Sequence, residues 1–496
     1  MEKVVFLTGA TGGMGMETLK KFMESTDEFK LRVLARPSEA NKKKLALYGD
    51  KIEIVWGDLK DDDKLFEGVK GADYVLHVGA FLSPFADEFP DEAMRINYGS
   101  TLSMINSIKK LGQQDTTHFV YIGTVAMTGD RMPPIHWGRV GDPLKPSIYD
   151  YYAISKCFAE RAVIESGLKY WVSIRQTGIA PVNASSGEYP IISHQPYNNC
   201  LEWANAEDSG NLMRNVCKDL VSEKFWRRVY NLSGGADYRQ TCYTFSASLG
   251  SDLRETNESN WFATGNFHGQ FYTDADDLEA LVPFRTKSFK QVQMEALQGF
   301  AEMMKAAGES FTPPTLEQMK AHNKEVISKP GGVLQFVADN DEERIKVWFG
   351  SREKYEAIPK NWNEISIVKP CDSPTKLDHG FDESKPIDEL DIEDMKQAAK
   401  FRGGECLSDS MTKGDIYTQL KWKCAFGHEF YATPYLILFA GHWCKDCDSE
   451  EWKYGEMAEV NPFFGQVWTP LHKEEEPFRV KMVTDPHEIE KIYEDK

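Results

Sequence analysis

The sequence predicts an α/β fold with a doubly wound parallel sheet, a substrate lobe and an appended C-terminal module. Apolar runs alternate with helical patterns from residue 3 to about residue 176. The glycine-rich segment TGATGGMG follows the first run, and paired cysteine and histidine residues gather between positions 424 and 447. Because strands that alternate with helices form parallel sheets covered on both faces, we expect such a sheet in the first half of the chain.

Six apolar runs supply the predicted strands, in order along the chain. They are VVFLT (4–8), LRVLA (31–35), IEIVW (52–56), DYVLHVG (73–79), HFVYIG (118–123) and WVSIR (171–175). Segments between them, such as METLKKFMES (16–25) and MRINYGSTLSMINSIKKL (94–111), show the spacing of amphipathic helices. The regularity ends after residue 178, and a helix is expected again within 287–308.

Proline- and glycine-rich clusters divide the remainder of the chain. TPPT (312–315), KPGG (329–332) and a long segment at 369–386 interrupt the periodic patterns, and such clusters mark connectors. The sequence therefore predicts three parts. They are a cofactor and substrate domain at 1–310, a partly helical connector at 311–390, and a zinc-binding module with a tail at 391–496.

Composition limits the classes of partner. The chain has 496 residues, of which 41% are hydrophobic, enough to bury large cores. A formal net charge of -19 argues against nucleic acid or an anionic membrane as the main partner. The nine cysteines do not form a disulfide framework, and the first apolar run is too short for a signal segment. We expect a cytoplasmic location and a small-molecule substrate. The sequence leaves the oligomeric state open, and a homodimer is one alternative.

The segment TGATGGMG at 8–15 has the spacing of a dinucleotide-binding turn. Gly9, Gly12 and Gly15 allow a tight turn and let the backbone approach a pyrophosphate at the start of a helix. Arg36 ends the second strand, where folds selective for unphosphorylated NAD carry an acidic residue. Arg36 therefore favours NADP and leaves NAD open, unless it is only a solvated cation. Asp58 is expected near the adenine.

A tyrosine and a lysine lie one helical turn apart in YYAISK. Of the neighbouring tyrosines, only Tyr152 has a lysine, Lys156, four residues later. An ammonium group stabilises phenolate, so this spacing suits a tyrosine that exchanges a proton. Thr124 follows the apolar strand HFVYIG and can hold a substrate oxygen. The alternative is an ordinary pair on a helix surface.

Region 1–240 resembles the extended short-chain dehydrogenase/reductase family, of the NAD-dependent epimerase/dehydratase type. The resemblance rests on the glycine turn, GDL around Asp58, HVGA (77–80), INYGST around Asn97, Thr124, Tyr152 with Lys156, RQTGIAP (175–181) and YNLSGG (230–235). It implies a Rossmann-type fold and hydride transfer at a carbon bearing a hydroxyl or carbonyl. Tyr152 would exchange the proton, Thr124 orient the oxygen and Lys156 tune Tyr152. Implied cofactor contacts are Gly9, Thr11, Gly12, Gly15, Arg36, Asp58, Leu59, Ala80, Asn97, Tyr152 and Lys156.

Departures from the family pattern bear on the reaction. Val125 and Ala126 stand where dehydratases carry an acidic pair, and Thr128 stands where epimerases show tyrosine. We therefore expect an oxidoreductase that interconverts a secondary alcohol and a ketone. A sugar-nucleotide epimerase with tightly held NAD is the first alternative, and a non-catalytic cofactor-binding regulator or zinc-dependent interaction protein is the second. The expected substrate contacts, which ordinary packing could also explain, are Phe81, Ser83, His194 and Tyr197.

The segment KWKCAFGHEFYATPYLILFAGHWCKDC (421–447) has metal-ligand spacing. Cys424 and His428 form one close pair, and Cys444 and Cys447 form another, with two short strands predicted between the pairs. Four such donors suit tetrahedral zinc and leave no open position, so a structural zinc ion is expected. His442 or Cys406 could replace a ligand, and four reduced core residues are the alternative. The pattern is similar to zinc-ribbon-type modules, although its acidic surroundings argue against binding nucleic acid.

Overall fold

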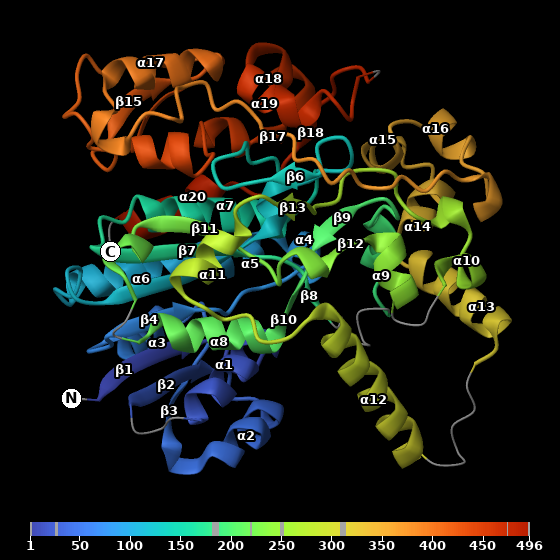
Figure 1. The fold of residues 1–496 in the computed structure, drawn as a ribbon, viewed down its shortest axis with the longest axis horizontal. Helices are drawn as coiled ribbons and strands as arrows, with labels where there is room; N and C mark the ends of the chain where they lie inside the picture. Colours follow the sequence, from blue (N-terminus) through green and yellow to red (C-terminus); the bar gives the residue numbers. More distant parts are fainter. Residues whose placement is uncertain are drawn as a thin grey trace.

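The computed structural model describes residues 2–24, 28–180, 188–218, 221–248, 252–307, 314–473 and 475–494. Its centre is a seven-stranded parallel sheet with the strand order β11-β7-β5-β4-β1-β2-β3 (Figure 1). All six predicted runs form strands of this sheet. The strands are β1 (Lys3–Thr8), β2 (Phe29–Ala35), β3 (Ile52–Trp56), β4 (Tyr74–His77), β5 (His118–Thr124), β7 (Tyr170–Gln176) and β11 (Arg228–Leu232).

Helices cover both faces of the sheet, as the doubly wound prediction requires. Side chains alternate along β1, so Phe6 packs into one buried cluster while Val5 and Leu7 pack into another. Helices α1 (Gly13–Met23) and α8 (Ala206–Val216) lie on the side of Val5. Helices α3 (Asp62–Val69), α6 (Ser100–Lys110) and α7 (Tyr151–Ile164) lie on the side of Phe6. These contacts confirm the predicted fold class.

A group of smaller elements follows the sheet. The helix expected within 287–308 is α12 (Phe289–Ala307), which projects from the body of the molecule (Figure 1). After it come α13 (Leu316–Ile327), α14 (Val333–Ala338), α15 (Glu342–Phe349) and α16 (Arg352–Glu356). No helix within the described ranges combines the length and the apolar character needed to cross a bilayer.

The C-terminal part contains helices around a small antiparallel sheet. The helices are α17 (Ile392–Phe401), α18 (Tyr454–Val460), α19 (Pro462–Trp468) and α20 (Pro486–Glu494), and the sheet comprises β14 (Glu405–Cys406), β15 (Leu420–Lys423) and β16 (Glu429–Ala432). The prediction of two strands between the metal pairs is wrong, because β15 ends before Cys424 and only β16 lies between them. Pro434 has helical backbone angles and begins a π-helical turn at Tyr435–Phe439, which replaces the second strand.

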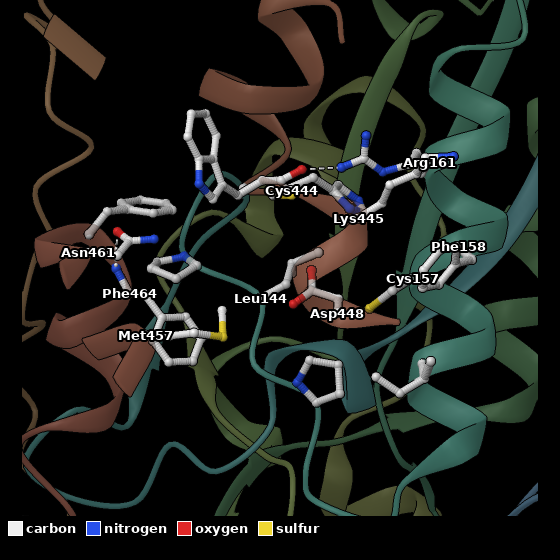
Figure 2. A pocket seen from close by; sticks show the side chains of 17 residues that line it. Leu144, Cys157, Phe158, Arg161, Cys444, Lys445, Asp448, Met457, Asn461 and Phe464 are labelled. Carbon is white, nitrogen blue, oxygen red and sulfur yellow. Dashed lines mark hydrogen bonds between the residues drawn. The ribbon is translucent and has the colours of Figure 1, made fainter. Parts of the chain in front are cut away.

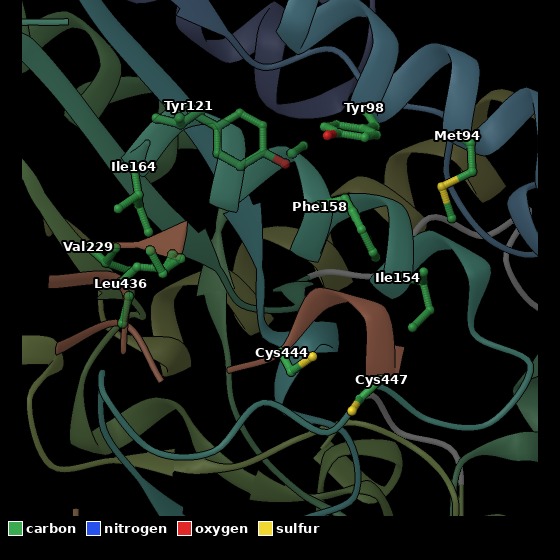
Figure 3. Close-up of a cluster of buried hydrophobic side chains, with 14 of the residues drawn as sticks. Met94, Tyr98, Tyr121, Ile154, Phe158, Ile164, Val229, Leu436, Cys444 and Cys447 are labelled. Carbon is green, nitrogen blue, oxygen red and sulfur yellow. The ribbon is translucent and has the colours of Figure 1, made fainter. Parts of the chain in front are cut away.

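These C-terminal residues pack on the same face of the sheet as α6 and α7. One buried cluster joins Tyr121 of β5 and Phe158 of α7 to Leu436 and Cys444 (Figure 3). Farther along, the Tyr98 hydroxyl donates to Oε1 of Glu490 on α20 at 3.0 Å. The helix that carries Tyr152 is therefore enclosed between the parallel sheet and the C-terminal part.

Candidate active site and metal centre

A cavity of about 790 Å³ lies at the carboxyl ends of the central strands. This is the place where the strand order reverses between β1 and β4, and open α/β sheets bind ligands there. Most of the predicted cofactor and catalytic residues line it. They are Gly9, Thr11, Gly12, Gly15, Arg36, Asp58, Leu59, Ala80, Thr124, Tyr152 and Lys156, joined by the predicted substrate contact Phe81.

The glycine turn leaves room that a side chain would fill. Gly9 has a φ of +75°, and a Cβ there would lie 2.7 Å from the backbone of Gly79. A Cβ on Gly15 would lie 2.0 Å from the carbonyl oxygen of Gly9. Gly12 caps α1 without a side-chain hydrogen bond, and the first turn of α1 has no acidic residue. The first N–H groups of α1 are thus open to an anion in the cavity, which fits a pyrophosphate.

Cationic side chains gather at the far end of the cavity, beyond β2. Arg36 lines it together with Asn41 and Lys44, two residues of α2 (Glu39–Leu45) that sequence reasoning missed. The Asn41 amide donates to the carbonyl oxygen of Arg36 at 3.0 Å, and Lys44 Nζ donates to that of Thr11 at 3.1 Å. The run of lysines at 42–44, shortly after Arg36, was the available signal. Both cations suit a phosphorylated ribose.

Tyr152 and Lys156 lie on one wall of the cavity, as their spacing predicts. Lys156 is buried and donates from Nζ to the carbonyl oxygen of Ile122 at 2.6 Å. Burial lowers the pKa of Lys156 to about 7, against the opposing effect of the Glu160 carboxylate. Burial also raises the pKa of Tyr152 well above its ordinary value of 10, although a hydrogen bond with Thr124 opposes this shift. In the free protein Tyr152 is therefore a proton donor at neutral pH.

Two carboxyl groups that sequence reasoning missed flank the start of α7. Asp87 accepts a hydrogen bond from the backbone N–H of Tyr151 at 2.9 Å, and Asp150 caps the helix by accepting from Ala153 at 2.7 Å. Burial and the neighbouring Asp150 raise the pKa of Asp87 to about 8. The aspartate directly before YYAISK was a readable helix cap, whereas the approach of Asp87 depends on the folded loop.

Other predicted site residues lie away from the cavity wall. Asn97 accepts from the N–H of Phe81 at 2.7 Å and donates to its carbonyl oxygen at 2.9 Å, so it holds the loop that carries Phe81. Ser83 hydrogen-bonds the carboxyl group of Asp87. His194 bonds the carbonyl oxygen of Gly331 at 2.7 Å and packs on Trp348, and Tyr197 packs edge-on against Trp362. The uncharged wall residues not predicted include Leu82, Ile96, Gln176, Thr177, Ile179 and Ala206.

A buried ionic network lies one turn beyond Lys156 on α7. Arg175 Nη2 pairs with Oε1 of Glu160 at 2.6 Å, and the Ser173 hydroxyl donates to Oε2 at 2.6 Å. Nε2 of His442 lies 3.0 Å from the same carboxylate, and Arg175 also donates to the carbonyl oxygen of Ala440 at 2.7 Å. Burial alone would raise the pKa of Glu160, but Arg175 and His442 hold it well below its usual range. The network joins α7, which carries Tyr152 and Lys156, to the C-terminal part.

We expect the substitution Glu160→Gln to lower the free energy of unfolding by about 3–5 kcal/mol, because it leaves Arg175 buried without its counter-charge. Urea denaturation at neutral pH measures the loss. The folded-state pKa of Glu160 lies below its ordinary value of 4.5, so the ion pair stabilises above that pH and less as the pH falls. The deficit of the variant should therefore shrink in acid.

The matched control is Glu53→Gln. Glu53 pairs with Arg32 at 2.8 Å, but its side chain is 39% exposed, so a change of at most about 1 kcal/mol is expected. If the two variants lost equal amounts of unfolding free energy, the buried network would stabilise the fold no more than an exposed ion pair does.

The four predicted metal ligands come together at the edge of the C-terminal sheet. Nδ1 of His428 lies 3.4 Å from Sγ of Cys424, 3.5 Å from Cys444 and 3.4 Å from Cys447. The sulfurs of Cys424 and Cys447 lie 3.7 Å apart. Tetrahedral zinc with bonds of about 2.3 Å to sulfur and about 2.0 Å to nitrogen needs donor separations of about 3.5–3.8 Å. The donor set therefore fits zinc.

The two substitutes considered for a ligand lie outside this group of four. His442 bonds Glu160, and Cys406 is not among the clustered donors of the described chain. A cavity of about 40 Å³ separates α7 from the metal-ligand segment, and Figure 2 shows Cys157 and Arg161 facing it from α7 and Asp448 from the other side. Arg161 donates across it to the carbonyl oxygen of Trp443. The group of candidate metal ligands thus lies directly against α7, the helix that carries Tyr152.

Known proteins resemble the first part of the chain. Residues 5–189 match the NAD dependent epimerase/dehydratase family. Over 282 residues the chain is 25% identical to 3 beta-hydroxysteroid dehydrogenase/Delta 5-->4-isomerase of Vaccinia virus (strain Western Reserve), covering 50% of this chain and 74% of that protein. It is 28% identical over 102 residues to UDP-glucose 4-epimerase of Rickettsia akari (strain Hartford), covering 20% of this chain and 30% of that protein. A dTDP-glucose 4,6-dehydratase from Streptomyces venezuelae, solved with NAD and TYD bound, is similar in structure over 60% of this chain and 97% of its own, with 18% identity and a TM-score of 0.48.

Proposed function

We propose that this protein is an NAD(P)-dependent oxidoreductase that interconverts a secondary alcohol and a ketone, because residues 5–189 match the NAD dependent epimerase/dehydratase family. The observation that carries the proposal is the meeting of Thr124, Tyr152 and Lys156 on one wall of a cavity whose other end is the glycine turn. A helix start open to phosphate and a buried tyrosine–lysine pair are what such a reaction requires.

In the proposed reaction Tyr152, Thr124 and Lys156 each have a separate role. When bound, the nicotinamide cofactor supplies the hydride donor or acceptor. The Tyr152 hydroxyl gives its proton to the substrate oxygen during reduction and takes it back during oxidation, and Thr124 holds that oxygen in place. Lys156, with Nζ fixed on the carbonyl oxygen of Ile122, supplies a nearby ammonium charge that favours the phenolate of Tyr152. The loop held by Asn97 presents Phe81 to the same space.

The residues around Thr124 favour net oxidation or reduction over elimination. Val125 and Ala126 are buried and apolar, so no acidic side chain directly follows Thr124. At the substrate end, Phe81, Leu82 and Ile179 line the cavity, and such a lining suits an alcohol or ketone on a largely apolar scaffold. The resemblance to a viral 3 beta-hydroxysteroid dehydrogenase supports the same class of reaction. We therefore propose a medium-sized apolar substrate.

The test follows the absorbance of the reduced nicotinamide while purified protein is offered NADPH or NADH with ketones, steroid-like alcohols and sugar nucleotides. We expect net consumption with a ketone, or net formation with a secondary alcohol. A flat signal while a sugar nucleotide is converted would replace the proposal by the epimerase reading. If the cofactor binds but no substrate of any class reacts, the result would support a non-catalytic regulator over an enzyme.

We propose that Arg36 makes NADP the preferred cofactor. The substitution Arg36→Asp should raise the KM for NADPH by about tenfold or more and lower that for NADH, because a carboxylate repels a 2'-phosphate and accepts from a ribose hydroxyl. Steady-state kinetics with both cofactors measures the change. The control is Lys42→Asp, the same charge change on α2 at a side chain that pairs with Glu39 outside the cavity wall. An unchanged KM for NADPH in Arg36→Asp would contradict the proposal.

We also propose that Cys424, His428, Cys444 and Cys447 hold a structural zinc ion. The donor separations support this, and four protein donors leave no position for a reacting water. The ion would fix the segment that carries Ala440 and His442 against α7, and so would help to keep Glu160 in place.

A further inference from the structure

A second cavity, of about 170 Å³, lies apart from the active-site cleft and shares no wall residue with it. Its wall comes from four stretches of chain. Residues between Asp130 and Ile148 precede α7, residues 264–266 and 347–354 come from the middle of the chain, and others between Tyr454 and Phe478 come from the C-terminal part. The cavity therefore lies where these four stretches meet.

Lys145 is the unusual group in this wall. Its side chain is buried, with 3% of its surface exposed, and Nζ has no hydrogen-bond acceptor within the described residues. Nζ lies over the ring of Trp468, 5.5 Å from its centroid. An unpaired buried ammonium costs several kcal/mol. Burial and the neighbouring Arg131 lower the pKa of Lys145 to about 8, against the attraction of Asp130 and Glu475.

The two acidic residues of the wall, Asp130 and Glu475, attract Lys145 from a distance, but each is held by other groups. Asp130 accepts backbone hydrogen bonds from Asn266 at 2.7 Å and from Met132 at 3.3 Å. Glu475 pairs with Lys354 at 3.5 Å. The hydroxyl of Ser147, another buried wall residue, also lacks a partner among the described residues. The wall thus offers a cation and a hydroxyl donor to whatever fills the space.

The size of the cavity limits the ligand. At about 30 Å³ per water, it has room for about five waters, well below the volume of a site for a drug-sized molecule. A small oxyanion, either a short-chain carboxylate or a phosphate, would fit this space and would give Lys145 its missing acceptor. We propose that this cavity is a second ligand site, which binds a small oxyanion through Lys145.

The site is connected to the start of the catalytic helix. The Tyr454 hydroxyl donates to the carbonyl oxygen of Pro146 at 2.8 Å, and the N–H of Ile148 donates to Oδ1 of Asn266 at 2.7 Å. Pro146 and Ile148 lie just before Tyr151 and Tyr152 in the chain. An anion on Lys145 would therefore stabilise the contact between the C-terminal part and the segment that leads into α7.

The test measures thermal unfolding of the full-length protein, with saturating NADP present so that phosphate does not bind at the glycine turn or beside Arg36. Sodium acetate and sodium phosphate are titrated separately against sodium chloride at equal ionic strength. In the wild type we expect a saturable rise in Tm with at least one of the two anions. In Lys145→Met the midpoint concentration should increase about tenfold or more. The more effective anion distinguishes a carboxylate ligand from a phosphate ligand.

Two further variants make the result decisive. Lys145→Gln keeps polar hydrogen-bonding atoms without the charge and should lose affinity in the same way. Lys169→Met removes an exposed lysine and should bind like the wild type. The proposal fails if neither anion exceeds chloride, if all variants respond alike, or if both Lys145 variants fail to fold, which would make Lys145 a structural group. Because binding is measured without turnover, these outcomes are independent of the proposed function.

Discussion

Replacing Tyr152 with phenylalanine is expected to reduce turnover by about a thousandfold while leaving cofactor binding in place. The hydroxyl is the group that exchanges a proton with the substrate oxygen, and general acid–base catalysis contributes about 10²–10⁴-fold. The ring of phenylalanine fills the same space, so the wall of the cavity is preserved. Single-turnover kinetics measures the rate, and fluorescence titration of reduced cofactor measures binding.

The matched control is the adjacent residue of the same helix. Tyr151 lies in the buried cluster, packs against Trp452, and accepts a hydrogen bond from the N–H of Val483 at 3.1 Å. Tyr151→Phe should therefore keep its catalytic rate and lose only stability. If Tyr152→Phe retained more than about a tenth of the activity, another group would have to move the proton, and Asp87 at the start of α7 would be the first to test.

Removing zinc is the second large expected effect. A chelator, or the substitution Cys444→Ser, should lower Tm sharply and expose the C-terminal residues to protease, because the three cysteine ligands lie inside the core shared with α7. Figure 3 shows two of them, Cys444 and Cys447, in that core. Structural zinc sites supply about 10–16 kcal/mol of apparent binding free energy in isolated zinc-finger peptides. Emission spectroscopy measures how much zinc the protein holds, and circular dichroism measures the change in Tm.

Cys371→Ser is the control for the loss of a thiol. Cys371 is exposed and lies outside the group of four donors, so this variant should keep both its zinc and its Tm. A purified protein that contains no zinc, or a chelated protein that unfolds at the same temperature as the untreated one, would contradict a structural role for the metal.

Local patterns carried most of the fold and part of the site. The apolar runs, the glycine turn and the spacing from Tyr152 to Lys156 are short-range features, so the parallel sheet and the cofactor wall could be predicted from them. The metal cluster followed from two close pairs, although Pro434 turned the second expected strand into a π-helical turn.

Contacts between distant segments could not be predicted in this way. His442 reaches Glu160 across 282 positions, and no local pattern reports such a pairing. His194 and Tyr197 follow the sixth predicted strand, yet they pack on Trp348 and Trp362 of a later segment whose placement only the folded chain determines. The burial of Lys145 likewise depends on four separate stretches of chain, which no local pattern brings together.

The enclosure of α7 has a consequence for biosynthesis. The parallel sheet has all its strands once Leu232 is made, but Leu436, which covers one of its faces, comes 204 positions later (436 minus 232). Because translation adds about 5–20 residues per second, that face of the sheet stays uncovered for about 10–40 s. During that interval Tyr121 and Phe158 lack their final partners. A nascent chain of this protein is therefore a natural client for chaperones that hold apolar surface until translation ends.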